Sequence, residues 1–406
     1  MWKTWAYGAT RDVTTMYGVG GHPTERGIVR WGARRTTVDY PPGTLYALAI
    51  VGRLYRAFDP PFRDTLGLLI AIKLGILTGD VLTCLCLFAL VRWRYGDDPA
   101  LLAALFYWLN PGVILDGAAL GYLDPWSAAP AIAAILAADT GAPVLCGAAM
   151  AVALAMKLQA IFLVPVAAIV LWNRTRGRVF LIGLVSGVLS IALLLAPFIW
   201  QGALLNVVQG ISSLLHHDML SGTAANVWWI VSWVLRAGDE VRRVGRLHAY
   251  RIIVRILPIS SFVHLGYPNP RPFATAAAAL MMTWAFWRAR RAPTSVVLAA
   301  GALAVHAYFV LAVQVHENHL FLALPLMAAA AALLPTLRGP FALVSAIFTL
   351  NLFLFYGIGR GVPLPPRGFT WIDATVVLSF VNVAALVWHA TRFAGCCRSM
   401  LTTIDG

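Results

Sequence analysis

The chain has 406 residues, of which 60% are hydrophobic and only 12% are charged, and its mean hydropathy is +0.76. Soluble domains contain about 45–50% apolar and about 25% charged residues, so this composition excludes a soluble protein. The formal net charge is +14. Basic loops beside anionic lipid head groups account for this charge, so we expect membrane lipids as partners and no nucleic acid.

Apolar segments of near-spanning length predict the fold class. Only helices satisfy their own backbone groups in lipid, so the sequence predicts an all-α, polytopic transmembrane helical bundle of about 11 spans. The stretch 142–172 is either one broken helix or two. The predicted spans are 66–91, 100–115, 125–139, 142–156, 158–172, 179–199, 272–287, 294–312, 319–334, 340–357 and 371–391.

Basic residues in the short loops predict the orientation. With an external N-terminus, the Arg-rich short loops all lie on one side, which is cytoplasmic by the positive-inside rule. We therefore expect an external N-terminal loop with interfacial helices at 1–65 and a transmembrane bundle at 66–391. The bundle includes an external loop at 200–271, and a cytoplasmic tail occupies 392–406.

The same threading brings polar clusters to the external face. The most informative is QVHENHLFLALP at 314–325, because ionisable groups beside a bilayer are costly and indicate function. An external pocket walled by several helices is expected. The other clusters are Asp116 with Asp124, Lys157 with Gln159, and His216, His217 and Asp218.

Two further features are an amphipathic stretch and the cysteines. The stretch 241–257 has amphipathic spacing and predicts an interfacial helix, with phosphate or pyrophosphate head-group binding as the alternative. The five cysteines show neither disulfide nor zinc spacing.

Five short motifs then occur in a fixed order. Together they resemble the membrane glycosyltransferases of the GT-C class. The resemblance is strongest to the dolichyl-phosphate-glucose-dependent glucosyltransferases of the endoplasmic reticulum, which extend the lipid-linked oligosaccharide, and to their bacterial relatives. The motifs are VDYPPGTLY (38–46), Lys73 with Asp80, NPGVILDGAALGYLDPWS (110–127), MKLQAIFLVP (156–165) and VHENHLFLALP (315–325).

This resemblance implies a hexosyltransferase of the bacterial inner membrane. Its donor would be a polyprenyl-phosphate sugar and its acceptor a lipid-linked or envelope glycan, with inversion at the sugar on the non-cytoplasmic face. No nucleotide domain is needed, because the lipid phosphate already activates the sugar. The resemblance implies no certain cofactor and leaves a divalent cation open.

The chain departs from the family pattern at two places. The family's catalytic Asp precedes a Trp in the first external loop, and the matching residues here are Trp2 and Trp5. That Asp and the first span are therefore expected upstream of Met1, in a longer form of the protein. The family's VHEK run is VHEN here, so Asn318 replaces a lysine that would meet the donor phosphate.

The motifs supply the candidate site residues. Asp124 and Glu317 are the fallback catalytic residues, although Asp124 could instead cap the next helix. Asn351 is assigned no function. Expected donor-phosphate residues are His316, Glu317, His319, Lys157 and Gln159, and expected acceptor or sugar residues are Asp116, Asp124, Asn226 and Trp228.

Structural roles are the alternatives for several of these residues: a snorkelling side chain for Lys157 and interfacial anchoring for the Trp228 segment. Competing functions are a lipid or sugar transporter or flippase, for which the sequence shows no internal repeat, and a catalytically inactive homologue.

Overall fold

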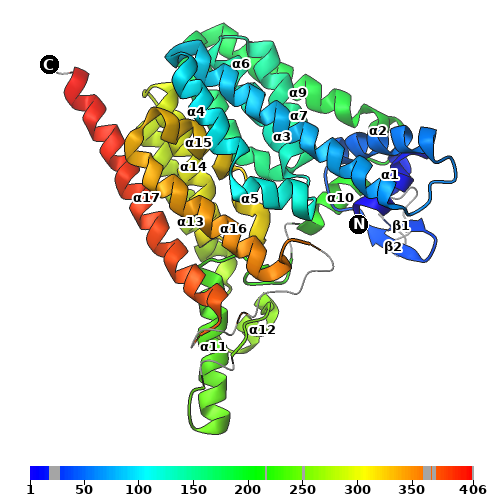
Figure 1. Ribbon diagram of the computed structural model, residues 1–406, viewed down its shortest axis with the longest axis vertical. Helices are drawn as coiled ribbons and strands as arrows, with labels where there is room; N and C mark the ends of the chain where they lie inside the picture. Colours follow the sequence, from blue (N-terminus) through cyan, green and yellow to red (C-terminus); the bar gives the residue numbers. More distant parts are fainter. Residues whose placement is uncertain (18–27, 215–216, 249–251, 360–366, 368–371, 405–406) are drawn as a thin grey trace. The chain divides into compact units, whose positions relative to one another are not determined.

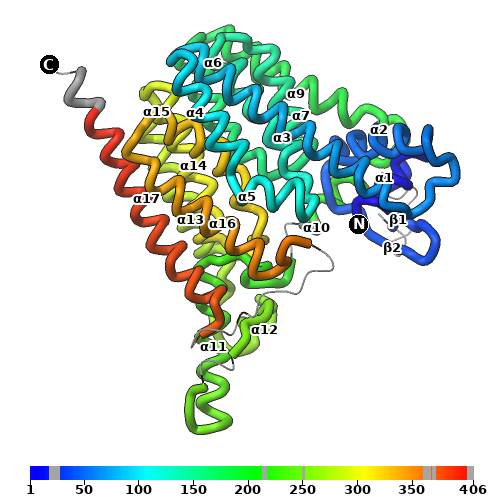
Figure 2. The backbone as a smooth tube through the Cα atoms, in the orientation of Figure 1, coloured from blue at the N-terminus to red at the C-terminus, as the bar shows by residue number. Residues whose placement is uncertain are grey.

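The computed structural model describes residues 1–406 except 18–27, 215–216, 249–251, 360–366, 368–371 and 405–406. The chain folds as two compact units (Figures 1 and 2). Unit 1 comprises Met1–Cys86 and Gly121–His217, and unit 2 comprises Leu87–Leu120 and Asp218–Gly406. Apart from one two-stranded antiparallel sheet, the regular structure of the described residues is helical.

Unit 1 begins with a small subdomain around a buried tryptophan. It contains helix α1 (Trp2–Ala9), strands β1 (Ile28–Trp31) and β2 (Arg34–Thr37), and helix α2 (Pro42–Phe58) (Figure 1). Trp5 is fully buried, and its Nε1 donates to Thr36 Oγ1 and to the Thr37 carbonyl, both at 2.9 Å. This ring therefore fixes α1 against β2.

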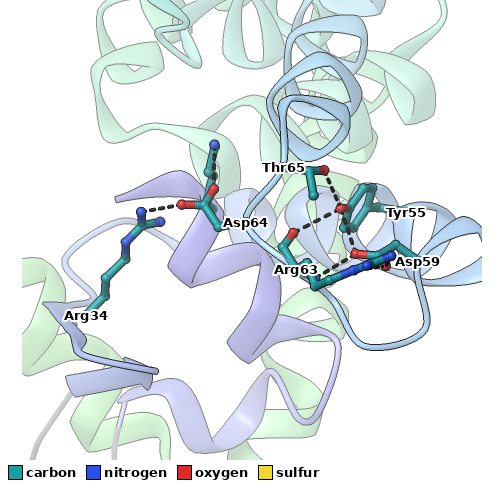
Figure 3. A network of polar contacts seen from close by, with 7 residues as sticks. Arg34, Tyr55, Asp59, Arg63, Asp64 and Thr65 are labelled. Carbon is teal, nitrogen blue, oxygen red and sulfur yellow. Dashed lines mark hydrogen bonds and ion pairs between the residues drawn. The ribbon is translucent and has the colours of Figure 1, made fainter.

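An ion-pair network closes the same subdomain after α2 (Figure 3). Asp59 accepts from the Arg63 backbone N–H at 2.7 Å and from Arg63 Nε at 2.9 Å, and Tyr55 donates to it at 2.9 Å. Lys3 of α1 donates to Asp64 at 2.7 Å, and Arg34 of β2 pairs with the same carboxylate. The connection from α2 to the first long helix is thus tied to both α1 and the sheet.

Long helices form the rest of unit 1. They are α3 (Leu66–Tyr95, which continues into unit 2), α6 (Asp124–Asp139), α7 (Pro143–Met156), α8 (Val164–Thr175), α9 (Gly177–Trp200) and α10 (Leu204–Leu214), with the 3₁₀ turn η3 (Leu158–Leu163) before α8. Only 6% of the most apolar window of α9 is buried, so most of this helix is left for lipid. α7 and α9 approach closely: a Cβ on Gly147 would lie 2.1 Å from the Gly183 carbonyl oxygen.

Unit 2 is built around a buried central helix. α14 (Thr294–Leu311) is 89% buried in its most apolar window, and α13, α15 and α17 pack against it (Figure 1). The other helices of the unit are α4 (Asp97–Trp108), α5 (Pro111–Val113) with the π-helix η2 (Ile114–Leu120), α11 (Val227–Val244), α12 (Ile259–His264), α13 (Pro270–Ala289), the 3₁₀ turn η5 (Glu317–Leu320), α15 (Ala323–Leu333), the 3₁₀ turn η6 (Pro335–Leu337), α16 (Arg338–Tyr356) and α17 (Ala374–Ile404).

The predicted fold class is confirmed: the protein is an all-α, multi-pass membrane protein. Each of the eleven predicted segments coincides with helix, and in the described part six helices are long and apolar enough to cross a membrane, or seven with the bent pair 97–120. That pair bends by 42° where one straight span at 100–115 was predicted. The stretch 142–172 is broken at Lys157, where φ is −154° and ψ is 127°.

One predicted helix is wrong. The described part of the stretch 241–257 does not form one amphipathic helix, because α11 ends at Val244 and Gly245 adopts a left-handed φ of 74° that terminates it. Beyond that helix end, residues 252–257 have no regular structure. At the other end of the chain, α17 continues through most of the expected cytoplasmic tail.

Candidate active site

The structure distributes the predicted site residues between the two units. Unit 1 holds Asp124, Lys157 and Gln159. Unit 2 holds Asp116, Asn226, Trp228, His316, Glu317 and His319. The predicted residues thus form two groups, one in each unit.

In unit 1, two of the motif segments pack against one another. Thr44 Oγ1 donates to the Met156 carbonyl at 2.5 Å, and a Cβ on Gly43 would lie 2.7 Å from the Ala155 backbone. The glycine therefore permits a backbone-to-backbone approach at the start of α2. This approach places the 38–46 segment directly against the end of α7, where the chain leaves the helix at Lys157.

Lys157 forms a buried ion pair with Asp124. Its Nζ lies 2.6 Å from Asp124 Oδ1, and the two side chains are 8% and 1% exposed. Asp124 is the first residue of α6, but the N-cap position is Leu123, so the alternative role of Asp124 as a helix cap is not what the structure shows. Gln159, two residues beyond Lys157, has a buried Oε1 without a hydrogen-bond partner in the described part of the chain.

Asp39 and Tyr40 complete this group. Lys157 Nζ lies 5.9 Å from the centroid of the Tyr40 ring. Burial raises the pKa of the neighbouring Asp39 carboxyl above its ordinary value, although its own backbone N–H and the charge of His217 oppose that shift. A carboxylate whose pKa is raised is a stronger proton acceptor, so Asp39 has the chemistry of a candidate base.

In unit 2, the HENH cluster lies on one of two paired loops; it comprises His316, Glu317, Asn318 and His319. The Gly222 N–H donates to the Val315 carbonyl at 2.8 Å, and the Gln314 N–H donates to the Leu220 carbonyl at 3.1 Å. Both loops carry left-handed residues that are not glycine, Thr223 at φ 66° and Gln314 at φ 64°. Such conformations cost about 1–3 kcal/mol each and cluster at functional sites. One strained residue, Gln314, lies two positions before His316, and the other, Thr223, lies on the loop paired with it.

Glu317, the carboxylate of the cluster, is buried and hydrogen-bonded. It is 2% exposed, and Thr223 Oγ1 lies 2.5 Å both from its Oε2 and from the Gly222 carbonyl oxygen. The hydroxyl has one proton, and it donates this proton to the carboxylate because an ionised oxygen is the stronger acceptor. The ring of His316, 37% exposed, places Nδ1 3.9 Å from the same oxygen. The His316 and His319 ring centroids lie 5.4 Å apart, and Tyr308 stacks on His319. His316 thus lies beside Glu317, at ion-pair distance but beyond hydrogen-bond distance, and the predicted role of the two residues stays a prediction.

Two of the remaining predicted residues, Asn226 and Trp228, are occupied in structural contacts. Asn226 is fully buried and caps α11, since its Oδ1 accepts from the Trp228 and Trp229 N–H groups. Trp228 Nε1 donates to the Leu311 carbonyl at 2.8 Å. Asp116 is fully buried within the π-helix η2. Whether any of them also contacts a sugar stays a prediction.

A cavity of about 650 Å³ adjoins Thr223 in unit 2. Its volume lies in the range of small-molecule sites, about 300–1,000 Å³. Two arginines line it. Arg255 is exposed, and Arg367 donates to the Val254 carbonyl at 3.1 Å while its Cζ lies 4.9 Å from the Phe355 ring centroid. The full lining is Thr223, Trp229, Ile253, Val254, Arg255, Ile256, Leu354, Phe355 and Arg367.

Sequence reasoning missed part of this cavity. Arg255 falls in the stretch for which head-group binding was the alternative interpretation, but Arg367 carried no signal because it is a single arginine in a loop. In the described part of the chain, no group of three or more His, Cys, Asp or Glu side chains is arranged to hold a metal ion. His216 lies outside the described residues.

Comparison with known proteins adds a structural similarity. The chain is similar to the crystal structure of ArnT from Cupriavidus metallidurans in the apo state, with a TM-score of 0.48 and 14% sequence identity, covering 98% of this chain and 71% of that one. No protein-family model and no curated protein matches the chain. This similarity is too low to support a conclusion about family or function.

Proposed function

We propose that this protein is a GT-C-type membrane glycosyltransferase. It moves a hexose from a polyprenyl-phosphate donor to a lipid-linked or envelope glycan acceptor, on the non-cytoplasmic face of the membrane and with inversion. The observation that carries the proposal is Thr223, which holds the Glu317 carboxylate and also lines the cavity that contains Arg255 and Arg367. The motif resemblance supports the same class.

The reaction needs a proton acceptor and a stabilised leaving group. Glu317 takes the proton from the acceptor hydroxyl while the oxygen of that hydroxyl bonds to the anomeric carbon of the donor sugar. The bond from that carbon to the phosphate oxygen breaks, and the phosphate leaves with the electron pair. General-base catalysis of this kind contributes about 10²–10⁴-fold, and fixed cations at the departing charge contribute a further large factor.

The arginines suit the departing phosphate. The Arg367 guanidinium is oriented by Val254, by the Phe355 ring and by the buried Asp373 carboxylate 3.9 Å from its Nη2, and it carries more N–H donors than its bond to Val254 uses. Arg255 adds a second cation in place of the lysine that VHEN lacks. His316 and His319 then serve to orient Glu317 and the donor, while the buried Lys157–Asp124 pair of unit 1 orders its own unit.

The test is transfer from a labelled polyprenyl-phosphate hexose. Purified protein in lipid nanodiscs should release unglycosylated polyprenyl phosphate and label an acceptor glycolipid. Glu317→Gln should lower kcat by about 10²–10⁴-fold, and Arg367→Gln should lower kcat/KM by about 10–100-fold. Arg53→Gln, at an exposed arginine of α2, is the matched control and should change neither. A Glu317→Gln enzyme with normal turnover would rule out this base.

A further inference from the structure

Two asparagines inside the helices of unit 2 hold the turn that carries Thr223. Asn351 of α16 donates from Nδ2 to the Thr223 carbonyl at 3.0 Å and accepts the Ala225 N–H on Oδ1 at 2.6 Å. Asn382 of α17 donates to the Ala225 carbonyl at 2.7 Å. Both asparagines are fully buried, so each of these contacts is made without competition from water.

A pair of buried histidines orients Asn382. His306 of α14 lies with Nε2 2.9 Å from Asn382 Oδ1, and its Nδ1 lies 3.3 Å from Nδ1 of His389. Because Asn382 Nδ2 already donates to Ala225, its Oδ1 must accept, so His306 carries its proton on Nε2. The Nδ1 of a neutral His306 then accepts, and His389 carries its proton on Nδ1.

A series of contacts connects the buried histidines to the candidate base Glu317. It passes from His389 through His306, Asn382, the Ala225 backbone, Asn351 and Thr223 to Glu317. The contact residues come from α14, α16, α17 and two loops, so residues up to 157 positions apart (225 and 382) come into contact only in the folded unit. None of these asparagine bonds supports the helix in which the asparagine lies.

We propose that Asn351 and Asn382 are positioning residues for Glu317. They hold Thr223 in its left-handed conformation, which directs the Thr223 hydroxyl at the carboxylate, and the two histidines keep Asn382 in the required orientation. The inference rests on the proposed function for its kinetic consequence. The hydrogen bonds by which Asn351 and Asn382 fix the Thr223 turn are independent of that function.

Hydrogen exchange measures how firmly the Thr223 turn is held, and it needs no substrate. In Asn351→Leu and Asn382→Leu, the peptide covering 219–226 should exchange at least about 10-fold faster than in the wild type. Thr349→Val and Ser379→Ala are matched controls from the same two helices, because each of those hydroxyls bonds only to its own helix backbone. Exchange that is unchanged in the asparagine variants, or equally faster in the controls, would overturn the proposal.

Kinetics measures the positioning. Both asparagine variants should lower kcat by about 10–100-fold while KM stays within about 2-fold, because a small misplacement of a catalytic group slows the chemical step. Thr223→Val should show the same loss and be non-additive with Asn351→Leu, whereas Thr223→Ser should retain turnover. Faster exchange with a normal kcat would refute the positioning role. If the wild type transfers no hexose, the proposed function fails, and exchange alone decides whether the turn is held.

Nitrogen NMR of ¹⁵N-histidine-labelled protein tests the histidine pair. The wild type should show His306 protonated at Nε2 and His389 protonated at Nδ1, assigned by His306→Gln and His389→Gln. Asn382→Leu should abolish the fixed tautomer of His306. The opposite tautomers in the wild type would overturn the assigned direction of the network.

Discussion

Removal of either member of the Lys157–Asp124 pair should destabilise unit 1. The two charges lie 2.6 Å apart with side chains at most 8% exposed. At an effective dielectric constant of about 20, their gross attraction is about 6 kcal/mol, and desolvation of both groups offsets most of it. A single neutral substitution removes the attraction but leaves one charge buried, so Lys157→Met or Asp124→Asn should cost about 3–5 kcal/mol.

The double variant separates stability from function. Lys157→Met with Asp124→Asn buries no charge, so its stability should return to within about 1–2 kcal/mol of the wild type. The assay is the apparent unfolding midpoint in nanodiscs, which should fall by about 5–10 °C in the single variants and recover in the double variant. Single variants with unchanged midpoints would refute the reasoning. If Lys157 also meets the donor phosphate, the double variant recovers its midpoint but not its turnover.

Other parts of the chain support three shorter predictions. The pKa of Asp59 is held below its ordinary value of 3.8 by Arg63, and that of Asp64 by Lys3, so the stability they provide is present above that value and is lost as the pH falls below it. The unfolding midpoint should therefore fall between about pH 5 and about pH 3, and fall less in Asp64→Asn. Thr223→Gly relieves the left-handed strain but removes the hydroxyl, so calorimetry should find stability within about 1 kcal/mol of the wild type while turnover drops. A reporter after Arg178 should read cytoplasmic and one near Asn269 external; the reverse at Asn269 would invert the predicted topology.

The helices could be predicted well from the sequence because apolarity and length are local properties. Each of the eleven predicted segments overlaps a described helix, although the predicted amphipathic helix at 241–257 is wrong because its periodicity was counted across Gly245. The division into two units was not anticipated. It depends on which helices pack together, such as α4 with α15, and hydropathy says nothing about that choice.

The sequence predicted which residues belong to the candidate site better than it predicted which residues they contact. His316 and Glu317 are adjacent in sequence, so their association needed no tertiary information. Thr223 and Glu317 lie 94 residues apart, and their contact depends on the pairing of two irregular loops. Asn351 was assigned no function, yet it holds the Thr223 turn. Its signal was available in principle, because a buried side-chain amide in an apolar helix needs partners outside that helix.

The close approach of α7 and α9 limits how unit 1 can move. With no side chain between Gly147 and Gly183, the two helices have no room to slide or roll past each other without a clash of backbone atoms. Any displacement of α7 therefore has to displace α9 as well. The backbone leaves helical geometry at Lys157, directly after α7, and the buried ion pair of that residue with Asp124 ties the end of α7 to the start of α6.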